Sequence, residues 1–310
     1  MGKAAAVDRL SSLAAVGATR EVLQAHGLAT KHALGQNFLV NDDIIKKIVA
    51  LAALEETDFV LEVGPGIGTL TEALLKCAGA VASVERDRDL PAVLEGTLAP
   101  WASRFALMQK DALDLQLSDI EAARASIAWV GRALPNKFVS NLPYAVAATI
   151  VLDFFQRFES LESATVMVQR EVGERIMAVP GTKNYGAYTV KLGMFARPVD
   201  KFAVSPGNFF PPPHVESMVL RLDRATPVDE TGVLLSPEEI SAACTMADAA
   251  FASRRKTIAN SCKTYFSGKD ASVAQALPQM FEQCGIAASR RGETLTQAEF
   301  IRLGRALLAL

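Results

Sequence analysis

The chain of 310 residues contains few of the residues that build metal centres or disulfide frameworks. Its four cysteines lie far apart without a Cys-x-x-Cys pair, and its three histidines do not cluster. Both patterns argue against a zinc site or a disulfide framework, so we expect reduced thiols and no metal. The residues are Cys77, Cys244, Cys262, Cys284, His26, His32 and His214.

Long apolar runs are missing as well. No segment approaches the roughly 20 consecutive apolar residues that cross a bilayer, so we expect no membrane-spanning helix. Residues 1–29 mix acidic and basic side chains and lack the basic start and apolar core of a secretory signal. We therefore expect a cytoplasmic protein.

An excess of positive charge is the third absence. The formal net charge is −2, which does not by itself indicate a nucleic-acid-binding protein. Two stretches nevertheless lean basic, and each fits either an RNA-binding surface or an ordinary solvated helix face. The first holds Arg170, Arg175, Lys183, Lys191 and Arg197, and the second holds Arg254, Arg255, Lys256, Lys263 and Lys269.

Short apolar runs alternate with helical patterns through the first half of the chain. This alternation predicts βαβ units, an α/β fold and a parallel sheet with helices on both faces. Ser217–Leu222 follows without a helix-length crossover, so we expect it to join the sheet as an antiparallel last strand. The expected parallel strands are residues 59–63, 80–84, 105–108, 137–140 and 164–168.

The last quarter of the chain has a helical pattern throughout. It follows a polar linker, and it opens with Ser236 as a helix cap and Pro237 at the first helical position. We expect an N-terminal extension over residues 1–30, an α/β domain over 31–224 and a small all-helical domain over 225–310.

A glycine-rich loop follows the first predicted strand. Gly64, Gly66 and Gly68 are spaced Gly-x-Gly-x-Gly, which differs from the dinucleotide fingerprint Gly-x-Gly-x-x-Gly. The loop also lacks the Lys-Ser/Thr pair of a phosphate-binding P-loop. A tight loop without a phosphate anchor suits a nucleoside with a small charged tail, such as S-adenosylmethionine. A nicotinamide nucleotide is the competing ligand, which the glycine spacing disfavours.

Two acids end the next two predicted strands. Glu85, about twenty residues beyond the loop, can accept both ribose hydroxyls, and Asp111 can accept from an adenine amino group. A single acid in such a place is usually a helix cap or a solvated charge. Because the carboxyl ends of parallel strands open on one crevice, we favour the ligand-binding role for both.

Asn141-Leu142-Pro143-Tyr144 ends the fourth predicted strand. The Asn141 oxygen and a backbone carbonyl can both accept hydrogen bonds from an exocyclic amine. The Tyr144 ring can stack on a base. Alone, these four residues also fit a strand-ending turn. Their place beside the predicted cofactor crevice favours a site for adenine.

Several motifs in one order resemble the ribosomal RNA adenine N6,N6-dimethyltransferase family, in particular its bacterial small-subunit members. The resemblance runs from the region of Thr30 to the C-terminus and implies a Rossmann-like class I methyltransferase fold. The motifs are Leu34–Leu39, Glu62–Gly68, Glu85, Asp111, Asn141–Tyr144, Phe209–Ser217 and, in the helical region, Phe251–Thr257.

The resemblance also implies the site residues. Phe209 would face Tyr144 across the target adenine, with core packing beside a proline turn as the alternative for Phe209. S-adenosylmethionine would contact Asn37, Leu39, Gly64, Gly66, Glu85, Asp111 and Asn141. The catalytic set would be Asn141, Leu142, Pro143, Tyr144 and Phe209. From the two basic stretches, we expect Arg170, Lys183, Arg254, Arg255 and Lys256 to contact RNA phosphates.

Members of this family convert two adjacent adenosines near the 3′ end of 16S rRNA to N6,N6-dimethyladenosine on a precursor 30S subunit. The resemblance implies this reaction and this partner, and we expect a monomer. Ala145-Val146 stands where the family more often has Asn-Ile, and His214 stands where Lys is common. These departures affect the expected substrate contacts and not the expected chemistry.

Two alternatives stay open. A 23S rRNA methylase of the macrolide-resistance type shares the chemistry, although such enzymes are more basic and usually carry Ile where this chain has Leu142. A non-catalytic ribosome-assembly or RNA-binding factor on the same fold is the other alternative. The intact glycines, Glu85, Asn141 and Tyr144 favour activity.

Overall fold

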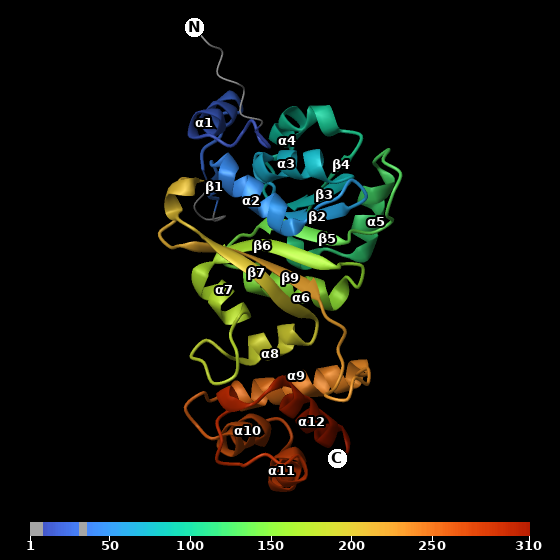
Figure 1. Ribbon diagram of the computed structural model, residues 1–310, viewed down its shortest axis with the longest axis vertical. Coiled ribbons are helices and arrows are strands. Elements are labelled where there is room, and N and C mark those ends of the chain that lie inside the picture. Colours follow the sequence, from blue (N-terminus) through green and yellow to red (C-terminus); the bar gives the residue numbers. More distant parts are fainter. Residues whose placement is uncertain (1–8, 31–35) are drawn as a thin grey trace. The chain divides into compact units, whose positions relative to one another are not determined.

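The structure is a computed structural model that describes residues 9–30 and 36–310 (Figure 1). Leu34 and Gly35, at the start of the first family-like motif, lie outside the described residues. None of the helices in these two ranges is long and apolar enough to cross a membrane.

The chain divides into two compact units. The first ends at Gly173 and resumes over Val199–Asp223, and the second comprises Glu174–Pro198 and Arg224–Leu310. The second unit thus takes in a segment that precedes the last strands of the sheet. The limits 1–30, 31–224 and 225–310 remain a prediction about separately folding domains.

One seven-stranded sheet organises the first unit, in the order β4-β3-β2-β5-β6-β9-β7. The pairs β3–β4, β2–β3, β2–β5 and β5–β6 are parallel, and β9 runs antiparallel to β6. The predicted α/β fold with a mostly parallel sheet and an antiparallel last strand is therefore confirmed. The strands are β2 Phe59–Val63, β3 Ala80–Glu85, β4 Phe105–Gln109, β5 Lys137–Asn141, β6 Ser163–Gln169, β7 Ala196–Val204 and β9 Ser217–Arg224.

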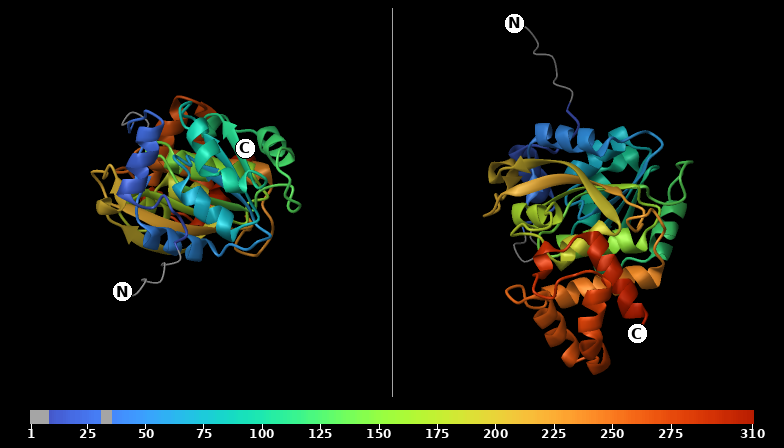
Figure 2. Two further views of the ribbon diagram at one scale, coloured as in Figure 1. Left: turned by 90° about the horizontal axis from the view of Figure 1, so that it is seen from above. Right: turned by 60° about the horizontal axis from the view of Figure 1, so that its bottom comes forward.

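The sequence did not reveal β7, which lies at the edge of the sheet beside β9 (Figure 2). Only its end residues, Ala196 and Val204, are buried. An exposed edge strand lacks the continuous apolar run by which a buried parallel strand is recognised. β9 consequently lies between β6 and β7, an order that the sequence pattern did not indicate.

Helices cover both faces of the sheet (Figure 1). Successive residues of a strand point to opposite faces, and β5 illustrates this. Val139 belongs to the apolar cluster that contains Ile45 of α2 and Leu74 of α3. The Phe138 ring instead lies 5.0 Å from the Phe154 ring of α6. These helices are α2 Asp42–Ala52, α3 Thr69–Cys77, α4 Pro91–Thr97, α5 Leu117–Ala125, α6 Ala147–Arg157 and α7 Arg170–Ile176.

Two short strands far apart in the sequence form a separate ribbon. β1 (Phe38–Leu39) pairs antiparallel with β8 (Phe209–Phe210), so that Phe38 lies opposite Phe210 and Leu39 opposite Phe209. The ribbon thus joins the family-like motifs Leu34–Leu39 and Phe209–Ser217. The helix α1 (Val16–Ala25) precedes it in the chain.

Helices build most of the second unit (Figures 1 and 2). Ser236 caps α9 as predicted, because its hydroxyl accepts the Glu239 N–H while the Glu239 carboxylate accepts the Ser236 N–H. A Cβ at Gly304 of α12 would lie 2.5 Å from the Ala243 backbone nitrogen, so glycine permits α9 and α12 to pack closely. The helices are α8 Ala187–Gly193, α9 Pro237–Phe251, α10 Ile258–Ser267, α11 Ala271–Gln283 and α12 Gln297–Leu308.

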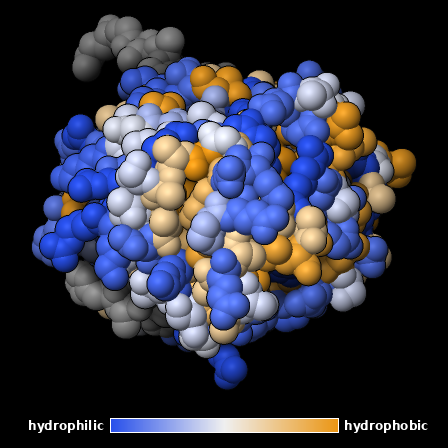
Figure 3. Space-filling model, turned by 90° about the horizontal axis from the view of Figure 1, so that it is seen from below, coloured by the Kyte–Doolittle hydropathy of each residue, from blue (hydrophilic) through white to orange (hydrophobic). Residues whose placement is uncertain are grey.

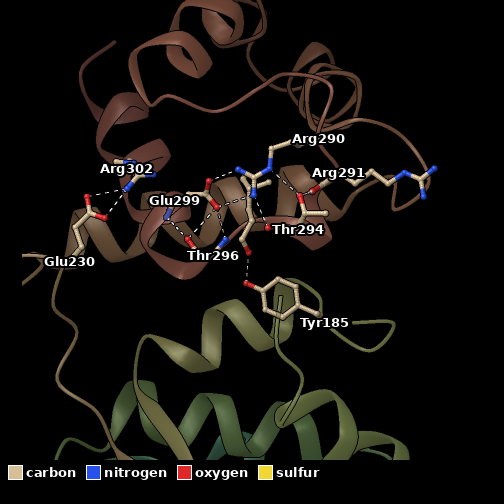
Figure 4. Close-up of polar contacts among 9 residues, drawn as sticks. Tyr185, Glu230, Arg290, Arg291, Thr294, Thr296, Glu299 and Arg302 are labelled. Atoms are coloured by element: carbon tan, nitrogen blue, oxygen red, sulfur yellow. Dashed lines mark hydrogen bonds and ion pairs between the residues drawn. The ribbon is translucent and has the colours of Figure 1, made fainter. Parts of the chain in front are cut away.

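A polar network fixes the loop between α11 and α12 (Figure 4). The Arg290 guanidinium pairs with the Glu299 carboxylate, which also accepts the Thr296 N–H at 2.8 Å. The Tyr185 hydroxyl donates to the Leu295 carbonyl at 2.9 Å. The helical unit therefore has its own polar framework in addition to an apolar core.

Candidate active site

Two adjoining pockets of about 90 and about 450 Å³ lie at the carboxyl ends of the central strands. They share the lining residues Gly64, Glu85, Pro143 and Tyr144 and so form one cleft. Ligand pockets usually measure about 300–1,000 Å³, so the cleft has room for a nucleoside with a tail. The smaller pocket also contains Asn37, Leu39, Gly66, Asn141 and Leu142, and the larger one contains Asp111.

The glycine loop has backbone conformations that other residues adopt only with strain. The φ angle is 68° at Gly64 and 60° at Gly66. A Cβ at Gly66 would lie 3.0 Å from Cε1 of Phe38, which is closer than ordinary contacts allow. The loop therefore lies directly against the Phe38 ring at the wall of the smaller pocket.

Glu62, at the base of the smaller pocket, is only 1% exposed. Its carboxylate accepts hydrogen bonds from the Thr71 and Ser83 hydroxyls, each at 2.7 Å. Burial raises its pKa to about 7, and the charge of Glu85 acts in the same direction. Glu62 therefore changes charge near neutral pH beneath the glycine loop.

Glu85 lines both pockets, which fits a contact to a ribose in the middle of the cleft. It accepts the Asp87 N–H at 2.8 Å, and burial raises its pKa. Asp87 in turn accepts a hydrogen bond from the Gln36 side chain at 2.7 Å. This bond ties the segment before β1 to the end of β3.

Asp111 lines the larger pocket. One carboxylate oxygen accepts the Leu113 N–H at 3.0 Å, and the other lies 3.2 Å from the Arg86 guanidinium. An adenine amino group at this position would share the carboxylate with Arg86. The predicted contact of Asp111 to adenine stays a prediction.

Asn141 lines the smaller pocket. Its Nδ2 donates to the Asn37 carbonyl at 3.3 Å, which leaves Oδ1 as the acceptor. The Leu142 N–H donates to the Met167 carbonyl at 3.1 Å and so extends the pairing of β5 with β6. The motif is therefore both the end of a strand and part of the cleft.

Tyr144 connects this motif with the one that ends in Ser217. Its hydroxyl lies 2.5 Å from the Ser217 hydroxyl, and the ring lines both pockets. Burial raises the pKa of the phenol, so Tyr144 stays protonated at neutral pH.

Phe209 has a different environment from the one expected for a stacking residue. It is 3% exposed, belongs to the apolar cluster of Leu39, Val204 and Val219, and lines neither pocket. This geometry favours the core-packing alternative over the predicted stacking on adenine. The physical reason is the ribbon, which pairs Phe209 with Leu39 and turns it into the core.

The residues of the cleft fit S-adenosylmethionine. Thr69 lines the smaller pocket, and its buried hydroxyl has no hydrogen-bond partner among the described residues. It is the first residue of α3, whose amino end favours a carboxylate. The acids Glu62 and Glu85 favour the positive groups of the same ligand and oppose the phosphates of a dinucleotide.

Several lining residues had no predicted role. Gln36, Glu62 and Thr69 contact the smaller pocket, as does the ring of Phe38. A sequence signal existed for each of them. Gln36, Phe38 and Glu62 belong to the family-like motifs Leu34–Leu39 and Glu62–Gly68, and Thr69 directly follows the second of them.

The residues predicted to contact RNA have unequal environments. Arg254 is paired with Glu293 at 3.1 Å and donates to the Lys183 carbonyl, so it holds two loops of the helical unit together. Arg255 and Lys256 are exposed, and neither forms an ion pair with the described part of the chain. Arg170, in the first unit, pairs with Glu216.

The helical unit offers polar surface beside these cations. A shallow pocket along α10 is lined by Lys256, Lys263 and neighbouring polar side chains. Figure 3, which looks onto the side where α10 and α11 lie, shows hydrophilic residues interspersed with hydrophobic ones on this face. Such a surface suits phosphate groups better than an apolar partner.

Within residues 9–30 and 36–310, no group of three or more His, Cys, Asp or Glu side chains is arranged to hold a metal ion.

Comparison with known proteins relates most of the chain to proteins named as ribosomal RNA methyltransferases. The family model described as ribosomal RNA adenine dimethylase matches residues 27–303. The chain is 38% identical over 294 residues to a ribosomal RNA small subunit methyltransferase A of Shouchella clausii, covering 93% of both chains. A protein of the same name from Enterococcus faecalis is 37% identical over 290 residues, covering 93% of this chain and 94% of the relative.

Solved structures share the fold. A dimethyladenosine transferase from Plasmodium falciparum superposes with a TM-score of 0.68 at 20% identity, covering 86% of this chain and 95% of that one. A 23S rRNA methyltransferase, ErmE, superposes with a TM-score of 0.59 at 24% identity, covering 87% and 99%. These likenesses support the class I methyltransferase architecture.

Proposed function

Since the chain belongs to the ribosomal RNA adenine dimethylase family, we propose that it dimethylates N6 of two adjacent adenosines near the 3′ end of 16S rRNA. Membership of the family makes it an rRNA adenine methyltransferase that uses S-adenosylmethionine. The single observation that carries the proposal is that Asn141–Tyr144 and the glycine loop line one cleft.

S-adenosylmethionine, when bound, supplies a methyl group activated by its sulfonium. Asn37 and Asn141 would contact it from one wall, and Thr69 would meet its carboxylate. Glu85 would accept the ribose hydroxyls, and Asp111 would accept from its adenine. The remaining predicted contacts are Leu39, Gly64 and Gly66.

Asn141 and Leu142 hold the target amine. The N6 lone pair of adenine is delocalised into the ring, so the amine is a weak nucleophile until its hydrogens are held out of the ring plane. Asn141 Oδ1 and the Leu142 carbonyl would accept these two hydrogens. Such positioning lowers the activation free energy of a well-aligned reaction by roughly 7–11 kcal/mol.

Tyr144 stacks on the adenine and does not act as a base. Its phenol is kept protonated by burial and held by Ser217. A base is not required, because the alkylated nitrogen loses its proton readily. Extruding the adenine from its stack costs about a few kcal/mol, which the ring contact offsets in part. Ala145 is exposed and lines the larger pocket, and its small side chain is the proposed source of space for a second methyl group.

The small ribosomal subunit is the proposed substrate, because the curated relatives carry that subunit in their names. Arg170, Lys183, Arg254, Arg255 and Lys256 are the proposed RNA contacts, and all five are exposed. We propose that the chain acts as a monomer, in the cytoplasm, on a precursor 30S particle.

The decisive experiment measures transfer of labelled methyl groups from S-adenosylmethionine to undermethylated 30S subunits, 50S subunits and naked rRNA. We expect dimethyladenosine in the 30S product only. Methylation of the 50S subunit alone would replace the proposal with the 23S alternative. Binding of S-adenosylmethionine without transfer to any of the three substrates would favour a non-catalytic assembly factor.

A further inference from the structure

The N-terminal extension, to which the sequence assigned no role, is fastened to the cofactor unit by buried polar contacts. The Ser11 hydroxyl and the Ser12 N–H donate to the Glu72 carboxylate at 3.0 and 2.8 Å. The Ser11 N–H donates to Asp42 at 2.9 Å. Glu72 belongs to α3 and is 5% exposed, so the contact lies inside the fold.

The apolar side of the extension packs against the wall of the smaller pocket. Leu13 and Leu23 are buried in one cluster with Phe38, Ile67 and Leu90. Ile67 belongs to the glycine loop, and Phe38 and Leu90 line the pocket. The extension is therefore one layer of side chains away from the cofactor site.

A third contact reaches the ribbon. The Arg20 guanidinium lies over the Phe210 ring, 4.9 Å from its centroid, and Phe210 is paired with Phe38 across β1 and β8. The Phe38 ring thus lies against Gly66 of the glycine loop, and it belongs to the same buried cluster as Leu13 and Leu23 of the extension.

We propose that residues 10–28 act as a positioning element that holds the Phe38 ring against the glycine loop and so preorganises the site for S-adenosylmethionine. The inference rests on the proposed function only for the identity of the ligand. Without this cover, Phe38 loses the packing that fixes its rotamer, and the loop must be ordered when the cofactor binds. Ordering a site at the moment of binding lowers affinity.

The test compares two leucine truncations by calorimetric titration with S-adenosylmethionine, in the absence of RNA. Leu23→Ala is expected to raise the dissociation constant about tenfold, because preorganisation is lost. Leu277→Ala is the matched control, since Leu277 is also buried but lies in α11 of the helical unit. It is expected to lower the unfolding temperature and leave the dissociation constant unchanged. Leu23→Met is expected to restore the affinity.

Two substitutions of exposed residues keep the inference testable if Leu23→Ala does not fold. Arg20→Met removes the cation over Phe210 and is expected to raise the dissociation constant about two- to fivefold. Lys47→Met removes an exposed charge from α2 and should have no effect. Unchanged cofactor affinity in Arg20→Met and in every folded Leu23 variant would overturn the inference.

The same titration separates this inference from the proposed function. A wild-type protein that binds S-adenosylmethionine, loses affinity in Leu23→Ala and yet methylates no ribosomal subunit would refute the function and support the inference. Methyl transfer to 30S subunits, with equal cofactor affinity in all variants, would support the proposed function and refute the inference.

Discussion

The cleft of the first unit and the basic surface of the helical unit hold their functional side chains in different ways. In the cleft, hydrogen bonds orient the side chains of Glu62 and Asn141, and the Phe38 ring lies so near Gly66 that a Cβ there would be crowded. On the helical unit, Arg255 and Lys256 are exposed and make no ion pair with the described residues. For the proposed contacts, the difference predicts recognition by geometry in the cleft and by salt-screened electrostatics on the surface.

The sharpest test of this comparison removes the amine acceptor. We expect Asn141→Ala to lower turnover on 30S subunits on the order of 100-fold, because a misplaced amine costs about that factor. Its S-adenosylmethionine dissociation constant should change far less, as measured by calorimetry. Asn184→Ala, in the helical unit, serves as the control. Near-normal turnover of Asn141→Ala would refute the acceptor role.

Adding a methyl group to the glycine loop tests whether the cleft recognises its ligand by geometry. Gly66→Ala combines a positive φ with a contact at 3.0 Å to Phe38. We expect cofactor affinity to fall about tenfold or more, since the left-handed conformation alone costs roughly 1–2 kcal/mol for a residue with a Cβ. Gly207→Ala is the control, because nothing lies within 4 Å of its Cβ position. Equal affinities for both variants would contradict the tight fit of the loop.

Reversing the charge of exposed basic residues tests whether the helical unit binds RNA by electrostatics. We expect Arg255→Glu with Lys256→Glu to weaken binding to 30S subunits and to reduce the salt dependence of log K by about 2, one unit for each lost phosphate contact. Cofactor affinity should stay unchanged. Arg254 is left intact, because its bonds to Glu293 and Lys183 are structural. Filter binding across a series of salt concentrations provides the measurement, and Lys47→Glu is the control. An unaltered slope of log K against log salt concentration would exclude Arg255 and Lys256 from the RNA interface.

The smallest expected effect concerns the titration of Glu62. Burial raises its pKa in the folded state from 4.5 to about 7, so the unfolded chain loses this proton first. The free energy of unfolding should therefore fall as pH rises between these values, by up to about 3 kcal/mol from this group. Denaturant unfolding at several pH values should show this slope, and Glu62→Gln should flatten it. An unchanged slope in the variant would assign the titration to another group.

Local patterns in the sequence predicted much of the fold and the cofactor half of the site. The buried strands β2, β3 and β5 are apolar runs, and the capping residues Ser236 and Pro237 mark the start of α9. The same patterns missed β7, because an exposed edge strand has no such run. They also suggested stacking for Phe209, because an aromatic next to a proline turn gives no sign of which way its ring points.

The sequence by itself determined the class of fold and the family, and it supplied most of the residues proposed for the reaction. The glycine spacing, the acids at the strand ends and the motif Asn141–Tyr144 can each be read from a few consecutive residues. Their functional groups are therefore known before the tertiary structure is. Only the tertiary structure decided which side chains meet. It buried Phe209, placed Glu62 and Thr69 at the cofactor pocket and set residues 10–28 behind Phe38. The physical reason is that burial and pairing depend on contacts between residues far apart in the chain, which no local pattern records.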